Sequence, residues 1–268
     1  MGVLSVKAQE KELYRKNKIT NKNKFFVYWG WNWANYSNSD INFKGENYNF
    51  TLYNVEAADR PTKFSFNDYF NPTRVTIPQT NYRIGYFFKE NYTISIGVDH
   101  MKYVMKQNQT VKINGNINVG SKYDGIYKND DITLSEDFLT FEHTDGLNYF
   151  NTEVKRFDDI SHWFNLNLEN LQINLTEGVG VGILYPKSNT KLLEKQRYDQ
   201  FHLAGWGVSA GIGLNITFLK YFFIQSDFKT GYINLPDIRT TASTTDSASQ
   251  SFYFFENNFL IGGKFRLF

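Results

Sequence analysis

The sequence contains no cysteine among its 268 residues, so structural disulfides and thiolate metal sites are excluded. It also lacks any run of about 18 apolar residues, so we expect no transmembrane helix. Neither sign of charge dominates, because 29 basic and 27 acidic residues give a net charge of +2. This balance argues against a nucleic-acid-binding protein. The four histidines lack the short spacing of a metal-binding pair, and we expect no metal and no cofactor.

Aromatic residues are abundant instead, at 18% of the chain, although the mean hydropathy is only −0.48. Many aromatics in a polar chain are typical of a membrane β-barrel with a lipid-facing band, aromatic girdles and polar loops. A chain without a spanning helix can cross a bilayer only as a closed barrel. A soluble barrel with an apolar lumen is an alternative, which would need apolar residues inside and polar residues outside. The length suits one domain.

Apolar and polar residues alternate with a period of two along much of the chain, which predicts β-strands. In residues 198–218 one face is continuously apolar and the opposite face is rich in glycine. Within residues 25–35, three successive positions on one face are tryptophans, namely Trp29, Trp31 and Trp33. Such a face is costly in water and natural at a lipid interface. The predicted membrane girdle comprises Trp29, Trp31, Trp33, Trp206 and Phe218.

Two short connections, residues 89–91 and 219–220, are predicted to be hairpin turns. Outer-membrane barrels keep short turns on the periplasmic side and long loops outside. Counting from an inside N-terminus predicts an all-β, closed, antiparallel up-and-down barrel. Its eight strands cover roughly residues 25–35, 76–88, 92–105, 138–155, 170–185, 198–218, 221–234 and 252–268. The outer loops are then residues 36–75, 106–137, 186–197 and 235–251.

The first of these loops is long for a structureless connection. Residues 48–55 within it have a good strand pattern, and residues 63–70 are consistent with one amphipathic turn. We interpret both as structure extending beyond the membrane. If residues 47–55 spanned the bilayer instead, a further strand in 106–137 would be needed, and the barrel would have ten strands.

The last stretch, residues 251–268, is an amphipathic strand ending in Phe268. It resembles the closing strand of small bacterial outer-membrane β-barrels of the eight-stranded type. In that family this segment is read by the barrel-assembly machinery, so the resemblance implies a multi-pass protein of the cell outer membrane with Phe268 as the insertion signal. Lys264 and Arg266 stand where the family has apolar residues.

The beginning of the chain carries Val6-Lys7-Ala8, which looks like the end of a secretory signal. We therefore expect residues 1–24 to be a signal remnant and periplasmic extension, and residues 25–268 to be the barrel. The abundance of Asn, Lys, Phe, Tyr and Ile resembles outer-membrane proteins of Bacteroidota.

Charged and polar residues on the inward faces are predicted to fill the lumen. Their charges must be paired and hydrogen-bonded if they are buried. Eight strands leave an interior that side chains just fill, so we interpret this set as a polar plug rather than a conduction path. The predicted lumen network comprises Arg83, Asp99, Gln225, Asp227, Lys229, Glu256, Lys264 and Arg266.

His143 is the candidate for catalysis. The segment with Glu142, Asp145 and a following Gly and Asn is similar to the active strand of outer-membrane lipid A deacylases, although a Thr or Asp stands where their nucleophilic Ser should be. Acyl hydrolysis needs a hydroxyl activated by a base that a carboxylate orients. The hydroxyl would have to come from another segment. Alternatively, His143 and Asp145 would activate a water.

The favoured function is non-enzymatic: a structural or surface-binding barrel whose long outer loops contact lipopolysaccharide, another ligand or a partner protein. The alternative is a lipid A acyl hydrolase centred on His143. The first loop carries the aromatic and basic residues expected to bind, which are Phe64, Phe66, Tyr69, Phe70 and Arg74.

Overall fold

The computed structural model describes residues 19–74, 77–164, 171–195, 197 and 200–267. Within these ranges strands dominate, and no helix is long and apolar enough to cross a membrane. The described helical turns are short: α2 (Phe66–Tyr69), η1 (Pro72–Arg74) and η2 (Ser161–Phe164).

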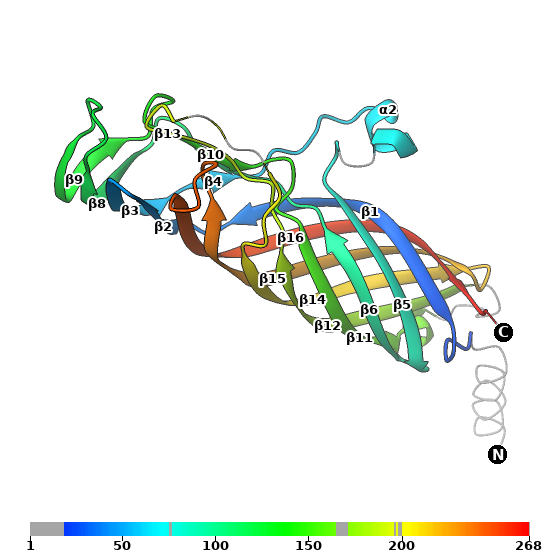
Figure 1. Ribbon diagram of the computed structural model, residues 1–268. Helices are drawn as coiled ribbons and strands as arrows, with labels where there is room; N and C mark the ends of the chain where they lie inside the picture. The colour runs from blue at the N-terminus through cyan, green and yellow to red at the C-terminus, as the bar shows by residue number, and fades with distance from the viewer. Residues whose placement is uncertain (1–18, 75–76, 165–170, 196, 198–199, 268) are drawn as a thin grey trace, which may run out of the picture.

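Eight antiparallel strands close into a ring because the last strand, β16, pairs with the first, β1 (Figure 1). The predicted closed up-and-down barrel of eight strands is confirmed. Residues 48–55 pair outside the ring, so the ten-stranded alternative is not the one observed. The ring strands are β1 (Phe25–Tyr36), β5 (Thr80–Lys89), β6 (Tyr92–Asp99), β11 (Tyr149–Asp159), β12 (Leu171–Leu184), β14 (Gly205–Phe218), β15 (Phe222–Arg239) and β16 (Ser247–Phe265).

Two of the predicted strands are interrupted. The segment predicted as one strand over 138–155 divides into β10 (Leu139–His143) and β11, because Gly146 adopts a φ of +121° that ends the first strand. The segment 92–105 likewise divides at Asp99, and its last residues form β7 (Tyr103–Met105), which joins a different sheet.

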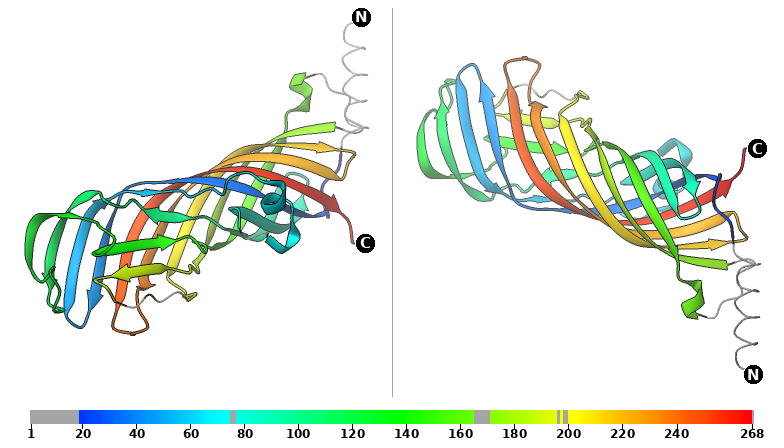
Figure 2. Two further views of the ribbon diagram at one scale, coloured as in Figure 1. Left: turned by 90° about the horizontal axis from the view of Figure 1, so that it is seen from above. Right: turned by 90° about the horizontal axis from the view of Figure 1, so that it is seen from below.

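The tight turns and the C-terminal end of β16 lie at one end of the ring (Figure 2). Leu219 and Lys220 both have positive φ, as a two-residue hairpin turn of the favoured type requires. Residues 19–24 also fold against this end, since the Asn23 amide donates to the Phe87 carbonyl at 2.9 Å. Residues 1–24 were expected to be a signal remnant and periplasmic extension, and the described part of that segment makes these contacts with the barrel. Residues 1–18 and Phe268 lie outside the described residues.

At the opposite end the sheet continues out of the barrel into a structure that we call the head. From β16 the pairing passes to further antiparallel strands, and a small second sheet lies beside them (Figure 2). The first group is β2 (Ser39–Gly45), β3 (Tyr48–Val55), β8 (Thr110–Ile117) and β9 (Gly125–Thr133), and the second is β4 (Ala57–Ala58), β7, β10 and β13 (Asn189–Leu192).

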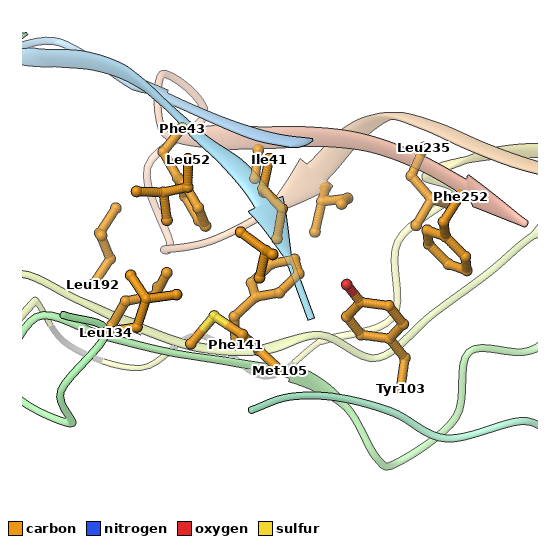
Figure 3. Close-up of a cluster of buried hydrophobic side chains, with 14 of the residues drawn as sticks. Ile41, Phe43, Leu52, Tyr103, Met105, Leu134, Phe141, Leu192, Leu235 and Phe252 are labelled. Atoms are coloured by element: carbon orange, nitrogen blue, oxygen red, sulfur yellow. The ribbon is translucent and has the colours of Figure 1, made fainter. Parts of the chain in front are cut away.

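The main hydrophobic core lies in this head rather than in the barrel. Side chains from both sheets and from the outer parts of β15 and β16 meet there, among them Phe43, Phe141 and Phe252 (Figure 3). A smaller apolar cluster, which includes Phe87 and Phe223, fills the barrel near the tight turns. Burial of this kind stabilises a fold by about 25 cal/mol per Å² of apolar surface. The head is therefore an integral folded part of the protein.

Inside the barrel, large side chains pack over glycines, in one case on the neighbouring strand: Phe26 of β1 pairs with Gly85 of β5. A Cβ at Gly85 would lie 2.3 Å from the Phe26 ring, whereas a Cβ at Gly263 would meet only the Tyr221 carbonyl, at 3.7 Å. The first glycine thus makes room for an aromatic plug, and the second does not.

We therefore expect Gly85→Val to destabilise the folded barrel by about 1–3 kcal/mol, the usual cost of overpacking a filled interior. Gly263→Val is the matched control and should change stability little. Urea unfolding in lipid vesicles, followed by tryptophan fluorescence, measures both. Equal unfolding midpoints for the two variants would contradict the packing described here.

Candidate functional site

The lumen holds seven of the eight polar residues predicted for it. Arg266 is the exception. It follows Phe265, the last residue of β16, and its side chain is exposed. The buried members are Arg83, Asp99, Gln225, Asp227, Lys229, Glu256 and Lys264.

Arg83 is the centre of this network. Its guanidinium donates to the Tyr28 hydroxyl at 2.8 Å and to the Asn151 side-chain oxygen at 2.6 Å. It also pairs with Glu153 at 3.2 Å and with Asp99 at 3.6 Å. The partners of Arg83 lie on β1, β6 and β11, which together with β5 are four successive strands of the ring, so Arg83 ties these neighbouring strands together.

Two lysines complete the charge balance. Lys229 donates to Asp99 at 2.6 Å and pairs with Glu153, and Lys155 donates to Asp227 at 2.6 Å. Sequence reasoning missed Glu153 and Lys155. Their period-two spacing would have placed them together on one face once the strand was bounded correctly.

Closer to the tight turns the lumen becomes aromatic. The Lys264 ammonium donates to Thr217 at 2.8 Å and lies 5.2–5.7 Å from the ring centres of Phe87, Phe157 and Phe223. The cavity left between this cluster and the charged network has a volume of only about 10 Å³, room for about one water. The side chains of the described strands therefore fill the barrel as a plug.

His143 lies in the head and is completely enclosed. Its Nδ1 is 2.8 Å from the Ser188 Oγ, and its Nε2 faces Gln250. The rings of Tyr103 and Phe141 pack against the imidazole. Burial lowers the pKa of His143 to about 3, so the ring is neutral at ordinary pH.

The carboxylates proposed to work with His143 point elsewhere. Glu142 alternates with it along β10 and pairs with Arg60 at 3.1 Å, while Asp145 lies beyond the strand and pairs with Lys187 at 2.9 Å. A serine does reach the histidine, but among the described residues the other ring nitrogen faces Gln250 rather than a carboxylate, and the pair is buried. The arrangement needed for acyl hydrolysis is therefore not formed. Among the described residues no cluster of three possible metal ligands occurs.

The aromatic loop residues form a compact segment that we call the flap, residues 62–74. Both of its ends are hydrogen-bonded to Ile77: the Thr62 hydroxyl donates to the Ile77 carbonyl at 2.8 Å, and the Ile77 amide donates to the Arg74 carbonyl at 3.0 Å. Within it, Ser65 caps α2 by accepting from the Asp68 amide, and the Tyr69 hydroxyl donates to the Thr62 carbonyl at 2.7 Å. An Arg74–Asp68 ion pair of 2.9 Å links η1 to α2 within the flap.

The flap lies against the outer wall of the barrel, beside the middle of β1 (Figure 1), where Trp31 pairs with Thr80 at the start of β5. Tyr69 and Phe70 pack on Trp31, with ring centroids 5.7 and 5.3 Å away. Trp31 was predicted to face lipid with the girdle, but the flap covers it and it is buried. Trp33 and Trp206 are exposed on the outer wall, and Trp29 and Phe218 are half-buried there.

Most of the rest of the outer wall is apolar, although the exposed Arg156–Glu177 ion pair also lies on it. Val179, Ile212 and Ile96, on β12, β14 and β6, are all more than half exposed. A wall that is apolar outside and charged inside reverses the pattern of a soluble barrel and matches one that spans lipid. The chain is an outer-membrane-type β-barrel.

Neither a protein-family model nor a curated protein matches this sequence. Among solved structures, the chain is similar to the outer membrane protein OprG from Pseudomonas aeruginosa, with 9% identity, a TM-score of 0.39, and coverage of 92% of this chain and 98% of that one. It is also similar to outer membrane protein AlkL, with 11% identity, a TM-score of 0.40 and coverage of 92% of both chains.

A third similar structure is Neisserial surface protein A, with 8% identity, a TM-score of 0.40, and coverage of 90% of this chain and 97% of that one. Similarities this low carry no argument about function. The architecture is established by the strand pairing itself.

The lumen network gives one prediction. Lys229→Met should destabilise the barrel by about 3–5 kcal/mol, because it leaves the buried carboxylates of Asp99 and Glu153 short of a cation. The matched control is Lys112→Met, which breaks an exposed pair with Asp131 and should cost at most about 1 kcal/mol. Denaturant unfolding in vesicles measures both, and similar losses for the two would refute the network's role.

His143 gives a pH prediction. Since its pKa is lowered in the folded state, the unfolded chain binds the proton preferentially below about pH 6.5. This histidine's contribution to stability should therefore fall as the pH drops from about 6.5 towards about 3, by up to about 1.4 kcal/mol per pH unit. His143→Gln should flatten that part of the stability curve. An unchanged slope in the variant would exclude this histidine as its source.

Proposed function

We propose that this chain is a non-enzymatic surface-binding barrel of the outer membrane, and that its flap contacts the lipopolysaccharide of the outer leaflet. The plugged lumen leaves the outer surface as the place where a ligand can be met. The buried His143 removes the main support for a hydrolase. Function is therefore sought among the exposed groups of the flap and the head.

The observation that carries the proposal is the exposure of rigidly held aromatic rings. Phe64 and Phe66 are 65% and 74% exposed, although the caps and hydrogen bonds of the flap fix the backbone that bears them. Exposed phenylalanines are unfavourable in water and favourable at the edge of a bilayer. A fixed scaffold that presents them lowers the conformational entropy lost on binding.

The position of the flap along the barrel axis also supports lipopolysaccharide as its partner. β5 has ten residues and β6 has eight, close to the nine to eleven or so that a tilted strand needs to cross a bilayer. The flap packs on Trp31, which pairs with Thr80, the first residue of β5, and we take this end of β5 as the outer boundary of the membrane. Its aromatic rings are placed where acyl chains meet headgroups.

The proposal is tested with Phe64→Ser/Phe66→Ser. We expect roughly ten-fold less lipopolysaccharide to remain with the barrel after extraction from an outer-membrane-competent host in mild detergent, with unchanged insertion and heat-modifiable mobility. The control is Ile126→Ser, which alters an exposed apolar residue of β9 in the head and should leave retention unchanged.

Equal retention by the double variant and the native chain would reject lipopolysaccharide as the flap's partner. Binding would then have to be sought with partner proteins at the head.

A further inference from the structure

A groove with a volume of about 740 Å³ is hollowed into the outer wall beside the flap, within the range of small-molecule sites, about 300–1,000 Å³. Its floor is formed by outward side chains of β5, β6 and β11, namely Tyr82, Val98 and Phe150. Phe70 of the flap forms one side. Tyr185 and Phe201 form the other, with their rings stacked at 5.6 Å and nearly parallel.

Several polar groups that border the groove are hydrogen-bonded within the protein, whereas the buried indole nitrogen of Trp29, another lining residue, has no hydrogen-bond partner among the described residues. His100 Nδ1 and Asn148 Oδ1 are 2.7 Å apart, and the Asn148 side-chain amide donates to the Tyr185 carbonyl at 3.2 Å. On the flap, the Asn71 side-chain oxygen accepts from the amide and hydroxyl of Thr73. A ligand in the groove is therefore recognised through its hydrocarbon part.

Among the described residues, three pairs of ionisable side chains lie on segments that follow or precede the residues lining the groove. The distance in each of three pairs is 2.9 Å. These pairs are Arg74–Asp68, Lys187–Asp145 and His202–Asp237.

The groove is continuous with the lipid-facing wall. Tyr82, Val98 and Phe150 also border a shallower depression that runs down the wall between β5, β6, β11 and β12, past Ile84 and Ile96. A lipid tail lying along the wall would pass from this depression into the groove without crossing water. A protein segment would have to displace lipid to reach the same place.

We infer that the groove holds one acyl chain of lipid A, clamped between Phe70 and the Tyr185–Phe201 stack, with its headgroup left in the interface. This inference deepens the proposed function and rests on it, since the flap that contacts the outer leaflet also forms one side of the groove. The flap supplies the surface contact and the groove holds a single tail.

The test is native mass spectrometry of the full chain in detergent, incubated with purified lipid A, a phosphatidylethanolamine or palmitate. The native protein should retain one lipid A. Val98→Trp fills the floor and should lower that retention roughly ten-fold. Val208→Trp places the same bulk on the exposed face of β14, away from the groove, and should leave retention unchanged.

Phe201→Ser removes one ring of the Tyr185–Phe201 stack without adding bulk to a strand. If Val98→Trp does not fold, the retention of lipid A by Phe201→Ser tests the inference instead. Retention of lipid A equal to that of the native chain in the folded variants would overturn the inference, as would preferential retention of palmitate or phosphatidylethanolamine. Phe64 and Phe66 do not line the groove. If the Phe64→Ser/Phe66→Ser variant loses lipid A while Val98→Trp retains it fully, the proposed contact of the flap with lipopolysaccharide stands and the binding of an acyl chain in the groove is rejected.

Discussion

The pairing of β1 with β16 is the constraint on which the rest of the structure depends. A bilayer offers no partner to an unpaired backbone donor or acceptor, so the sheet must close. The register from Phe25 opposite Phe265 to Tyr36 opposite Phe254 achieves this. Closure with eight strands fixes a narrow interior, and that interior must then be filled with matched charges around Arg83 and with aromatic rings near the turns.

Unequal strand lengths explain where the outer features lie. β5 and β6 end close to the membrane boundary, whereas β15 and β16 have 18 and 19 residues and continue into the head. The wall is consequently low on one side and high on the other. The flap and the groove occupy the low side, where outward side chains of the short strands meet loop aromatics from distant parts of the sequence.

Which side chains face outward and which face the lumen could be predicted, because apolar residues alternate with glycine or polar residues along each strand, as in residues 205–218. The tight turn at Leu219 was equally readable. The head could not be assembled in this way, since β3 has a clear strand pattern and a hairpin neighbour in β2, but its other partner, β8, lies in a different predicted loop. Gly146 ended a predicted strand through its backbone angle, which alternation does not reveal. The Ser188–His143 contact joins residues 45 apart, a tertiary fact with no local signal.

One consequence concerns force. β16 pairs with β1 in the barrel and with β2 in the head, and β15 accompanies it along nearly its whole length. A pull on the head is therefore transmitted along β16 and loads many hydrogen bonds in shear at once, rather than peeling them apart singly. The head cannot swing as a tethered domain would. Anything attached to the head is therefore held at a fixed angle to the barrel.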